Sequence, residues 1–156
     1  MSTRIDIQSA SQGAVQAMLQ LQDYVNQSGL ESSLLELVKM RASQINGCAY
    51  CLDMHAKEAR AAGESEQRLY LLDAWREAPF YTDRERAALE WTEAVTRVSD
   101  GHVPDEAFEA VSNQFGEDEL VDLTLAIVTI NGWNRLAISF RAEVGSHEPE
   151  KPARVA

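Results

Sequence analysis

The chain has 156 residues, of which 45% are hydrophobic, so it is long enough for one domain with a true core and too apolar for global disorder. Its formal net charge of −11 argues against nucleic acid and against an anionic membrane as partners, because both repel an acidic protein. No apolar stretch is long enough to span a bilayer and no targeting segment is visible, so a cytoplasmic location is expected.

The hydrophobic pattern predicts helices joined by short turns, without the alternation typical of a strand. Several helix ends carry a local signal. Asn46-Gly47 suits a left-handed cap, Ser65 suits an N-cap, and Thr82 with Glu85 resembles a capping box. The predicted helices run from about 9 to 28, 32 to 46, 48 to 62, 65 to 78, 82 to 100, 104 to 115 with Pro104 as first residue, and 117 toward 144 with a bend expected at Asn131-Gly132.

These elements predict a single all-α domain over residues 1–156, a bundle of about six to seven helices without a linker. The polar segment 145–156 contains two prolines and is expected to be a disordered tail. Apolar helix faces of this kind are often shared between copies, so a homo-oligomer is expected. Three tryptophans are candidate anchors of the core or of such an interface: Trp75, Trp91 and Trp133.

The two cysteines of the chain, Cys48 and Cys51, lie at the start of a predicted helix. In a reducing compartment such a close pair is more often catalytic or metal-binding than a structural staple. A spacing of three residues places both on one helix face, where free N–H groups and the helix dipole stabilise a thiolate. His55 follows Cys51 by one turn and can act as its base. By periodicity alone, Glu36 is a solvated residue.

Two kinds of dithiol site are consistent with these residues. In a redox enzyme, the base His55 favours Cys51 as the nucleophile, because a general base contributes about 10²–10⁴ in rate whereas the helix dipole, strongest at Cys48, contributes less than about tenfold. Cys48 is then expected to be the resolving and more accessible thiol. In a non-catalytic module, the cysteine pair would either act as a redox sensor or bind zinc, with His55 as a third ligand and Glu36 as a fourth. Structural zinc sites usually add a second close ligand pair, and His102 and His147 stand alone, so no metal is expected.

The spacing Glu36, Cys48-x-x-Cys51, His55 resembles the core motif of the alkylhydroperoxidase D-like family, within the carboxymuconolactone decarboxylase superfamily. The segment from Asn131 to Leu136 is similar to the N-x-x-N-R-L stretch of one branch of that family. The resemblance extends from about residue 15 to residue 144.

The resemblance implies an all-helical fold that assembles into trimers or hexamers. It further implies a peroxidase in which Cys51 attacks a hydroperoxide, Cys48 resolves the product, and His55 and Glu36 form a proton relay. Characterised peroxidases of this family tend to carry a histidine where this chain has Tyr50, so substrate and reductant can differ. The decarboxylase branch lacks the cysteine pair, which ranks that activity low. No G-x-G-x-x-G motif for a flavin or nicotinamide is present, so no cofactor is expected and an external dithiol must supply the electrons.

Overall fold

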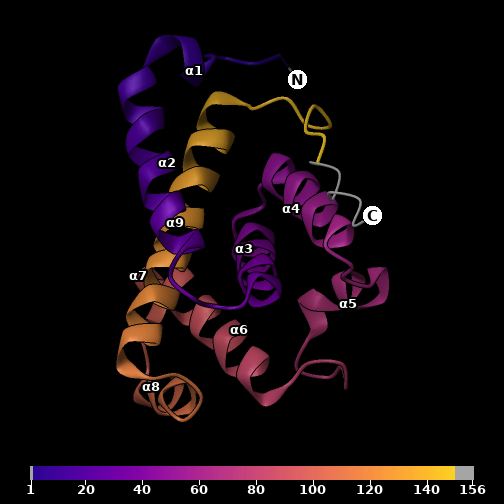
Figure 1. Cartoon of the computed structure of the whole chain (residues 1–156), viewed down its shortest axis with the longest axis vertical. Coiled ribbons are helices and arrows are strands. Elements are labelled where there is room, and N and C mark those ends of the chain that lie inside the picture. The colour runs from indigo at the N-terminus through magenta and orange to yellow at the C-terminus, as the bar shows by residue number, and fades with distance from the viewer. Residues whose placement is uncertain (1, 150–156) are drawn as a thin grey trace, which may run out of the picture.

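The structure, a computed structural model, describes residues 2–149, and every regular element in this part of the chain is a helix, which confirms the all-α prediction. No helix of the described residues is long and apolar enough to cross a membrane. Figure 1 shows α3 near the centre, with α2 and α9 on one side, α6 below, and α4 and α5 on the other side. The elements are α1 (Ile7–Ala10), α2 (Gln12–Asn26), α3 (Ser32–Asn46), α4 (Ala49–Ala61), α5 (Glu66–Tyr70), the 3₁₀ turn η1 (Leu72–Ala74), α6 (Asp83–Thr96), α7 (Val98–Gly101), α8 (Asp105–Ser112) and α9 (Glu117–Phe140).

The central helix α3 separates two hydrophobic clusters. One lies between α3 and the helices α2, α6, α8 and α9, and the other between α3 and the elements α4, α5, η1 and α6. Adjacent residues Leu37 and Val38 belong to different clusters, and both are fully buried. A helix with a cluster on either side must also bury polar residues, and each of these requires a partner. The buried polar residues of α3 are Lys39, Arg41 and Ser43.

Three of the predicted helix ends are confirmed in detail. Gly47 adopts the left-handed conformation (φ 68°, ψ 34°), Ser65 caps α5, and Thr82 forms a reciprocal capping box with Glu85. Pro104 is the residue before α8 and not its first residue. These ends depend on contacts within one turn, which explains why the sequence reveals them.

The last predicted helix ends earlier in the structure than expected. α9 is continuous through Asn131-Gly132, where the Asn131 side chain donates to Ile127 O of the same helix (2.9 Å). It ends at Phe140, where Arg141 takes a left-handed conformation (φ 56°). The chain then runs beside α4, where the His147 ring contacts Glu58. Thus part of the predicted tail, up to residue 149, is placed against α4, whereas residues 150–156 lie outside the described part.

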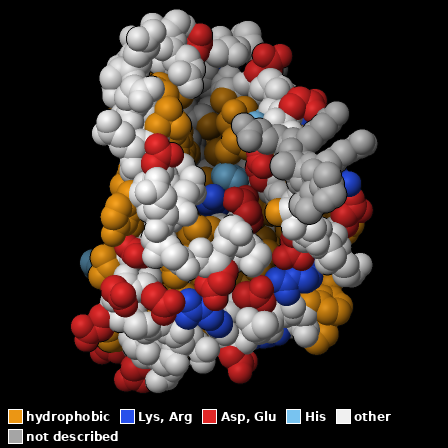
Figure 2. All heavy atoms as spheres, viewed as in Figure 1, with side chains coloured by type: hydrophobic (Ala, Val, Ile, Leu, Met, Phe, Trp, Pro, Cys, Tyr) orange, Lys and Arg blue, Asp and Glu red, His pale blue; other side chains and the backbone are white. Residues whose placement is uncertain are grey.

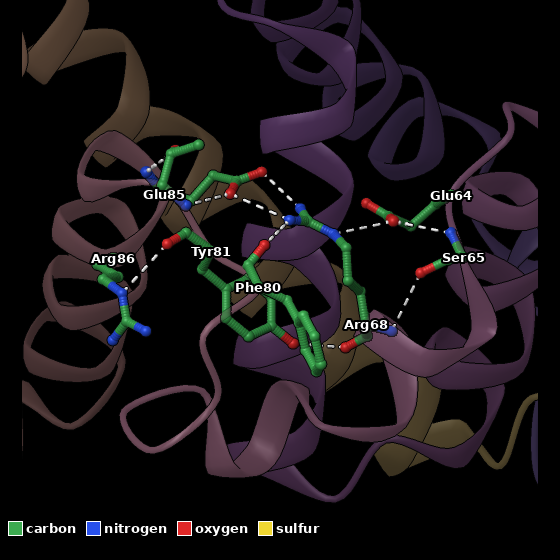
Figure 3. A network of polar contacts seen from close by, with 8 residues as sticks. Glu64, Ser65, Arg68, Phe80, Tyr81, Glu85 and Arg86 are labelled. Atoms are coloured by element: carbon green, nitrogen blue, oxygen red, sulfur yellow. Dashed lines mark hydrogen bonds and ion pairs between the residues drawn. The ribbon is translucent and has the colours of Figure 1, made fainter.

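The helix predicted over 65–78 is divided into α5 and η1. Arg68 of α5 contacts the loop that follows η1 and the first turn of α6. Figure 3 shows the Arg68 side chain between the carboxylates of Glu64 and Glu85. Its guanidinium lies 4.9 Å from the Tyr81 ring centre, and the Tyr81 hydroxyl donates to the Arg68 carbonyl. These contacts join α5, the following loop and α6. They are tertiary contacts, so no local pattern predicts the break.

Trp75 and Trp91 are both buried, as expected of core residues, whereas Trp133 is half-buried. The Trp75 indole N–H donates to Glu93 Oε1 (2.8 Å), and the buried Arg41 donates to the same oxygen (2.9 Å). Arg76 donates to Oε2 (2.6 Å). Burial alone would raise the pKa of Glu93, but these hydrogen bonds and the two arginine charges outweigh it and hold the pKa below its ordinary value.

We expect Glu93→Gln to lower the free energy of unfolding by about 3 kcal/mol, because it removes the buried counter-charge of the Arg41 guanidinium and leaves it paired with Asp73, whose side chain is 77% exposed. Glu90→Gln is the control: its carboxylate is on the same helix but 43% exposed. Since the folded pKa of Glu93 is lowered, its contribution is complete above the unfolded pKa and is lost as the pH falls through the folded value. Urea titrations at neutral and acidic pH measure both effects. A Glu93→Gln protein as stable as Glu90→Gln would contradict the expectation.

Candidate active site

The turn between α3 and α4 fixes the first cysteine. The Gly47 N–H donates to the Gln44 carbonyl (3.2 Å) and the Cys48 N–H to the Ser43 carbonyl (3.0 Å), which together make a Schellman motif. Cys48 is the N-cap of α4, and its Sγ accepts from the Cys51 N–H (3.4 Å). The sulfur of Cys48 therefore lies at the positive end of the α4 dipole.

Hydrogen bonds between asparagines of α3 and α9 stabilise this turn. Asn46 donates to the side-chain oxygens of Asn131 (2.9 Å) and Asn134 (2.8 Å). Asn134 is fully buried and donates to Ser43 Oγ (3.0 Å), directly beside the carbonyl that holds Cys48. The two asparagines of the N-x-x-N-R-L stretch thus position the last turn of α3. Sequence analysis singled out this stretch without assigning it a role, because its partners are about 90 residues away.

Cys48 and Cys51 form a disulfide, with Cα atoms 5.4 Å apart. Each is only 1% exposed. We expected Cys48 to be the more accessible of the two, and the structure corrects this: the packing of α4 against α3 and α9 buries both equally. Accessibility therefore does not distinguish the attacking sulfur from the resolving one.

Cys51, His55 and Ala59 recur every four residues and form the buried face of α4. Toward this face α3 presents Glu36, whose Oε2 lies 2.9 Å from His55 Nδ1. A carboxylate has no proton to give, so Nδ1 carries the hydrogen and donates it, which leaves Nε2 as the ring atom able to accept a proton. Periodicity placed Glu36 in solvent, whereas the structure buries most of it. The structure brings together all four residues that the motif singled out.

The second oxygen of Glu36 is also occupied. Lys39 Nζ donates to Oε1 (2.8 Å), and the lysine side chain is only 10% exposed. Burial favours the neutral acid, but the hydrogen bond and charge of His55, followed by those of Lys39, outweigh it and hold the pKa of Glu36 below its ordinary value. The carboxyl group is therefore an anion at neutral pH. Lys39 was missed by sequence analysis, since a lysine three residues after a glutamate is common on exposed helix faces.

Two recesses lie beside the helices that carry the site. Glu36 and Glu64 line a small pocket of 170 Å³, together with Ser33 and the small residues at the end of α4. On another side, Figure 2 shows a hollow between α9 and α4, with hydrophobic side chains along its walls and histidine, basic and acidic side chains near its floor. Among residues 2–149, no group of three or more His, Cys, Asp or Glu side chains is arranged to hold a metal ion.

Residues 12–94 match the sequence profile of the carboxymuconolactone decarboxylase family, and this range contains the whole Glu36–Cys48–Cys51–His55 constellation. A curated relative, the uncharacterized protein YdfG of Bacillus subtilis (strain 168), is 42% identical over 139 residues, which cover 89% of this chain and 95% of the relative. The chain belongs to the carboxymuconolactone decarboxylase family.

Within this family, the chain shares its fold with alkylhydroperoxidase D-like proteins. A crystal structure of a protein of unknown function from Agrobacterium tumefaciens, described as a candidate antioxidant defence protein AhpD, has a TM-score of 0.91 and 47% identity, and covers 94% of this chain and 100% of that one. The debrominase Bmp8, in complex with 2,3,4-tribromopyrrole, has a TM-score of 0.76 and 18% identity, over 88% of this chain and 74% of that one. The second likeness is one of fold alone.

Proposed function

We propose that this protein is a cysteine peroxidase that reduces organic hydroperoxides through the Cys48–Cys51 dithiol. The observation that carries the proposal is the 2.9 Å contact between Glu36 and His55, one turn after Cys51 and in a buried site. A carboxylate that orients a histidine beside a nucleophile is the usual arrangement for activating a thiol. Since a debrominase has the same fold, the fold alone does not choose the reaction, and the proposal depends on these side chains.

The proposed cycle has three steps. His55 Nε2 takes the proton of the Cys51 thiol, and the thiolate attacks one peroxide oxygen; the O–O bond breaks, Cys51 becomes a sulfenic acid, and the alcohol leaves with the proton from His55. The Cys48 thiol then condenses with the sulfenic acid, forming the disulfide and releasing water. An external dithiol reduces the disulfide by exchange and is itself oxidised.

The surroundings of the site support the choice of substrate and of electron source. The hydrophobic walls of the hollow in Figure 2 suit the apolar part of an organic hydroperoxide. The third step needs a dithiol pool, which the cytoplasm supplies, so we propose that the enzyme acts there. A homo-oligomer remains part of the proposal, and exposed apolar side chains on α8 and α9, such as Phe108, Val121 and Val128, are candidates for its interface.

The proposal predicts turnover of organic hydroperoxides at the expense of a dithiol. Stopped-flow mixing of the reduced protein with cumene hydroperoxide or hydrogen peroxide, against a panel of protein and small dithiols, should give a rapid oxidation of one dithiol per protein and then steady turnover. The organic peroxide should react faster. A dithiol that is not oxidised by any hydroperoxide, or a stoichiometrically bound zinc ion in the reduced protein, would instead favour a non-catalytic zinc-binding or redox-sensing module.

A further inference from the structure

The buried lysine of α3 has no role in the cycle described so far. Lys39 as a whole is 8% exposed, and its hydrogen bond with Glu36 is the ion pair that compensates its charge. Lysine is rarely buried to this degree, because its strongly hydrated ammonium loses more on desolvation than most side chains. A buried ion pair is generally no more stabilising than well-packed apolar residues in its place, so stability alone does not explain why this pair is present. Because Lys39 contacts the same carboxylate as His55, we looked to the chemistry of the site for its role.

The carboxylate of Glu36 bridges an ammonium and an imidazole. Its Oε1 accepts from Lys39 and its Oε2 from His55, so the two contacts act on the same anion. The negative charge of Glu36, acting alone, would oppose the loss of a proton from the Cys51–His55 pair. The positive charge of Lys39 offsets this effect, while the hydrogen bond from Glu36 still orients the imidazole ring.

We propose that Lys39 is a positioning residue that sets the pH at which the Cys51–His55 pair gives up its first proton. The proposal deepens the proposed peroxidase and rests on it for its biological meaning. The direction follows from charge alone: a fixed positive charge nearby favours the loss of a proton, whichever of the two groups retains the other one. Without Lys39, the reactive thiolate should therefore form only at higher pH.

The other charged groups near Glu36 form ion pairs with different partners. Glu64, across the small pocket from Glu36, is paired with Arg68 Nε (3.0 Å). Arg41, two residues after Lys39, is paired with Glu93 of α6. From α9, the buried residue that reaches the last turn of α3 is the uncharged Asn134. Lys39 is thus the cation that meets the Glu36 carboxylate in the described part of the chain.

The test uses Cys48→Ser as a background, so that Cys51 is the single cysteine. Thiolate formation is followed by its ultraviolet absorbance as a function of pH, which requires no peroxidase activity, and in parallel by the rate of reaction with cumene hydroperoxide. We expect Lys39→Gln to move both profiles to higher pH by about one unit, because glutamine keeps a hydrogen bond to Glu36 but not the charge. Lys39→Arg should restore the original profile. The matched control is Lys57→Gln, which removes the same charge from α4 at a position two residues after His55, where Lys57 pairs with Asp53 (2.9 Å) and donates to the His147 carbonyl.

A thiolate profile of Lys39→Gln that coincides with that of the parent would overturn the proposal, as would an equal shift in Lys57→Gln. Should Lys39→Gln not fold, Lys39→Arg decides: its profile should coincide with that of the parent, and a shift as large as one unit would refute a role based on charge. Absence of any reaction with hydroperoxide, together with a normal Lys39-dependent thiolate profile, would reject the peroxidase and leave the role of Lys39 intact.

Discussion

Cys51→Ser should abolish the reaction with hydroperoxide, whereas Cys48→Ser should still consume about one equivalent and then stop. The two cysteines differ in what each one contacts. Cys48 caps α4 and lies at the positive end of its dipole, and Cys51 lies one turn before His55 on the buried face. The dipole contributes about 0.3–1 kcal/mol at a helix end, whereas a positioned general base contributes about 10²–10⁴ in rate. The base should therefore decide which sulfur attacks.

The product identifies the role of each cysteine. In Cys48→Ser, the sulfenic acid on Cys51 has no resolving thiol and should be trapped by dimedone, which mass spectrometry of the Cys51 peptide detects. In Cys51→Ser, neither peroxide consumption nor a dimedone adduct is expected. If Cys48→Ser is inert and Cys51→Ser forms the adduct, the roles are reversed. Equal burial of the two sulfurs means that this result cannot be attributed to access.

Much of the fold is predictable from the sequence because its signals are local. The cap at Gly47 and the capping box at Thr82 and Glu85 depend on contacts within a few residues, and the structure has both. The break between α5 and η1 was not predicted, since it accompanies the contacts of Arg68 with Glu85 and Tyr81 from the following loop and helix. The periodicity of hydrophobic residues within a segment carries no information about contacts with residues outside it, such as Glu85 and Tyr81.

The candidate site shows the same division. The three-residue spacing of Cys48 and Cys51, and the four-residue spacing to His55, place these side chains on one helix without knowledge of the fold. Glu36 is different, because its pattern on α3 is that of an exposed residue and only the resemblance to a family assigned it to the site. Helix α3 has a hydrophobic cluster on either side, so charged side chains such as Glu36 and Lys39 are largely buried and form an ion pair with each other. Lys39 was missed for the same reason.

His55→Gln should slow the reaction of Cys51 with hydroperoxide by about 10²–10⁴ at neutral pH, and leave the fold intact. Glutamine can still donate to Glu36, but it has no nitrogen that takes a proton from a thiol. Glu36→Gln should cost less, about 10–100-fold, because the imidazole remains and loses only its orienting anion. Since the pKa of Glu36 is held low, that anion is present throughout the neutral range. His102→Asn is the control, at an exposed histidine outside the site, in the turn before α8.

The pH dependence separates a lost base from a lost fold. In His55→Gln, the rate should rise with pH as hydroxide replaces the missing base, so the deficit relative to the parent should shrink in alkaline solution. A misfolded site would show a deficit that does not depend on pH, and its thermal unfolding temperature would fall below that of His102→Asn. Single-turnover rates across the neutral and alkaline range, with unfolding measured on the same samples, decide between the two. A His55→Gln rate within threefold of the parent at neutral pH would remove His55 from the mechanism and, with it, the reason for placing the attack on Cys51.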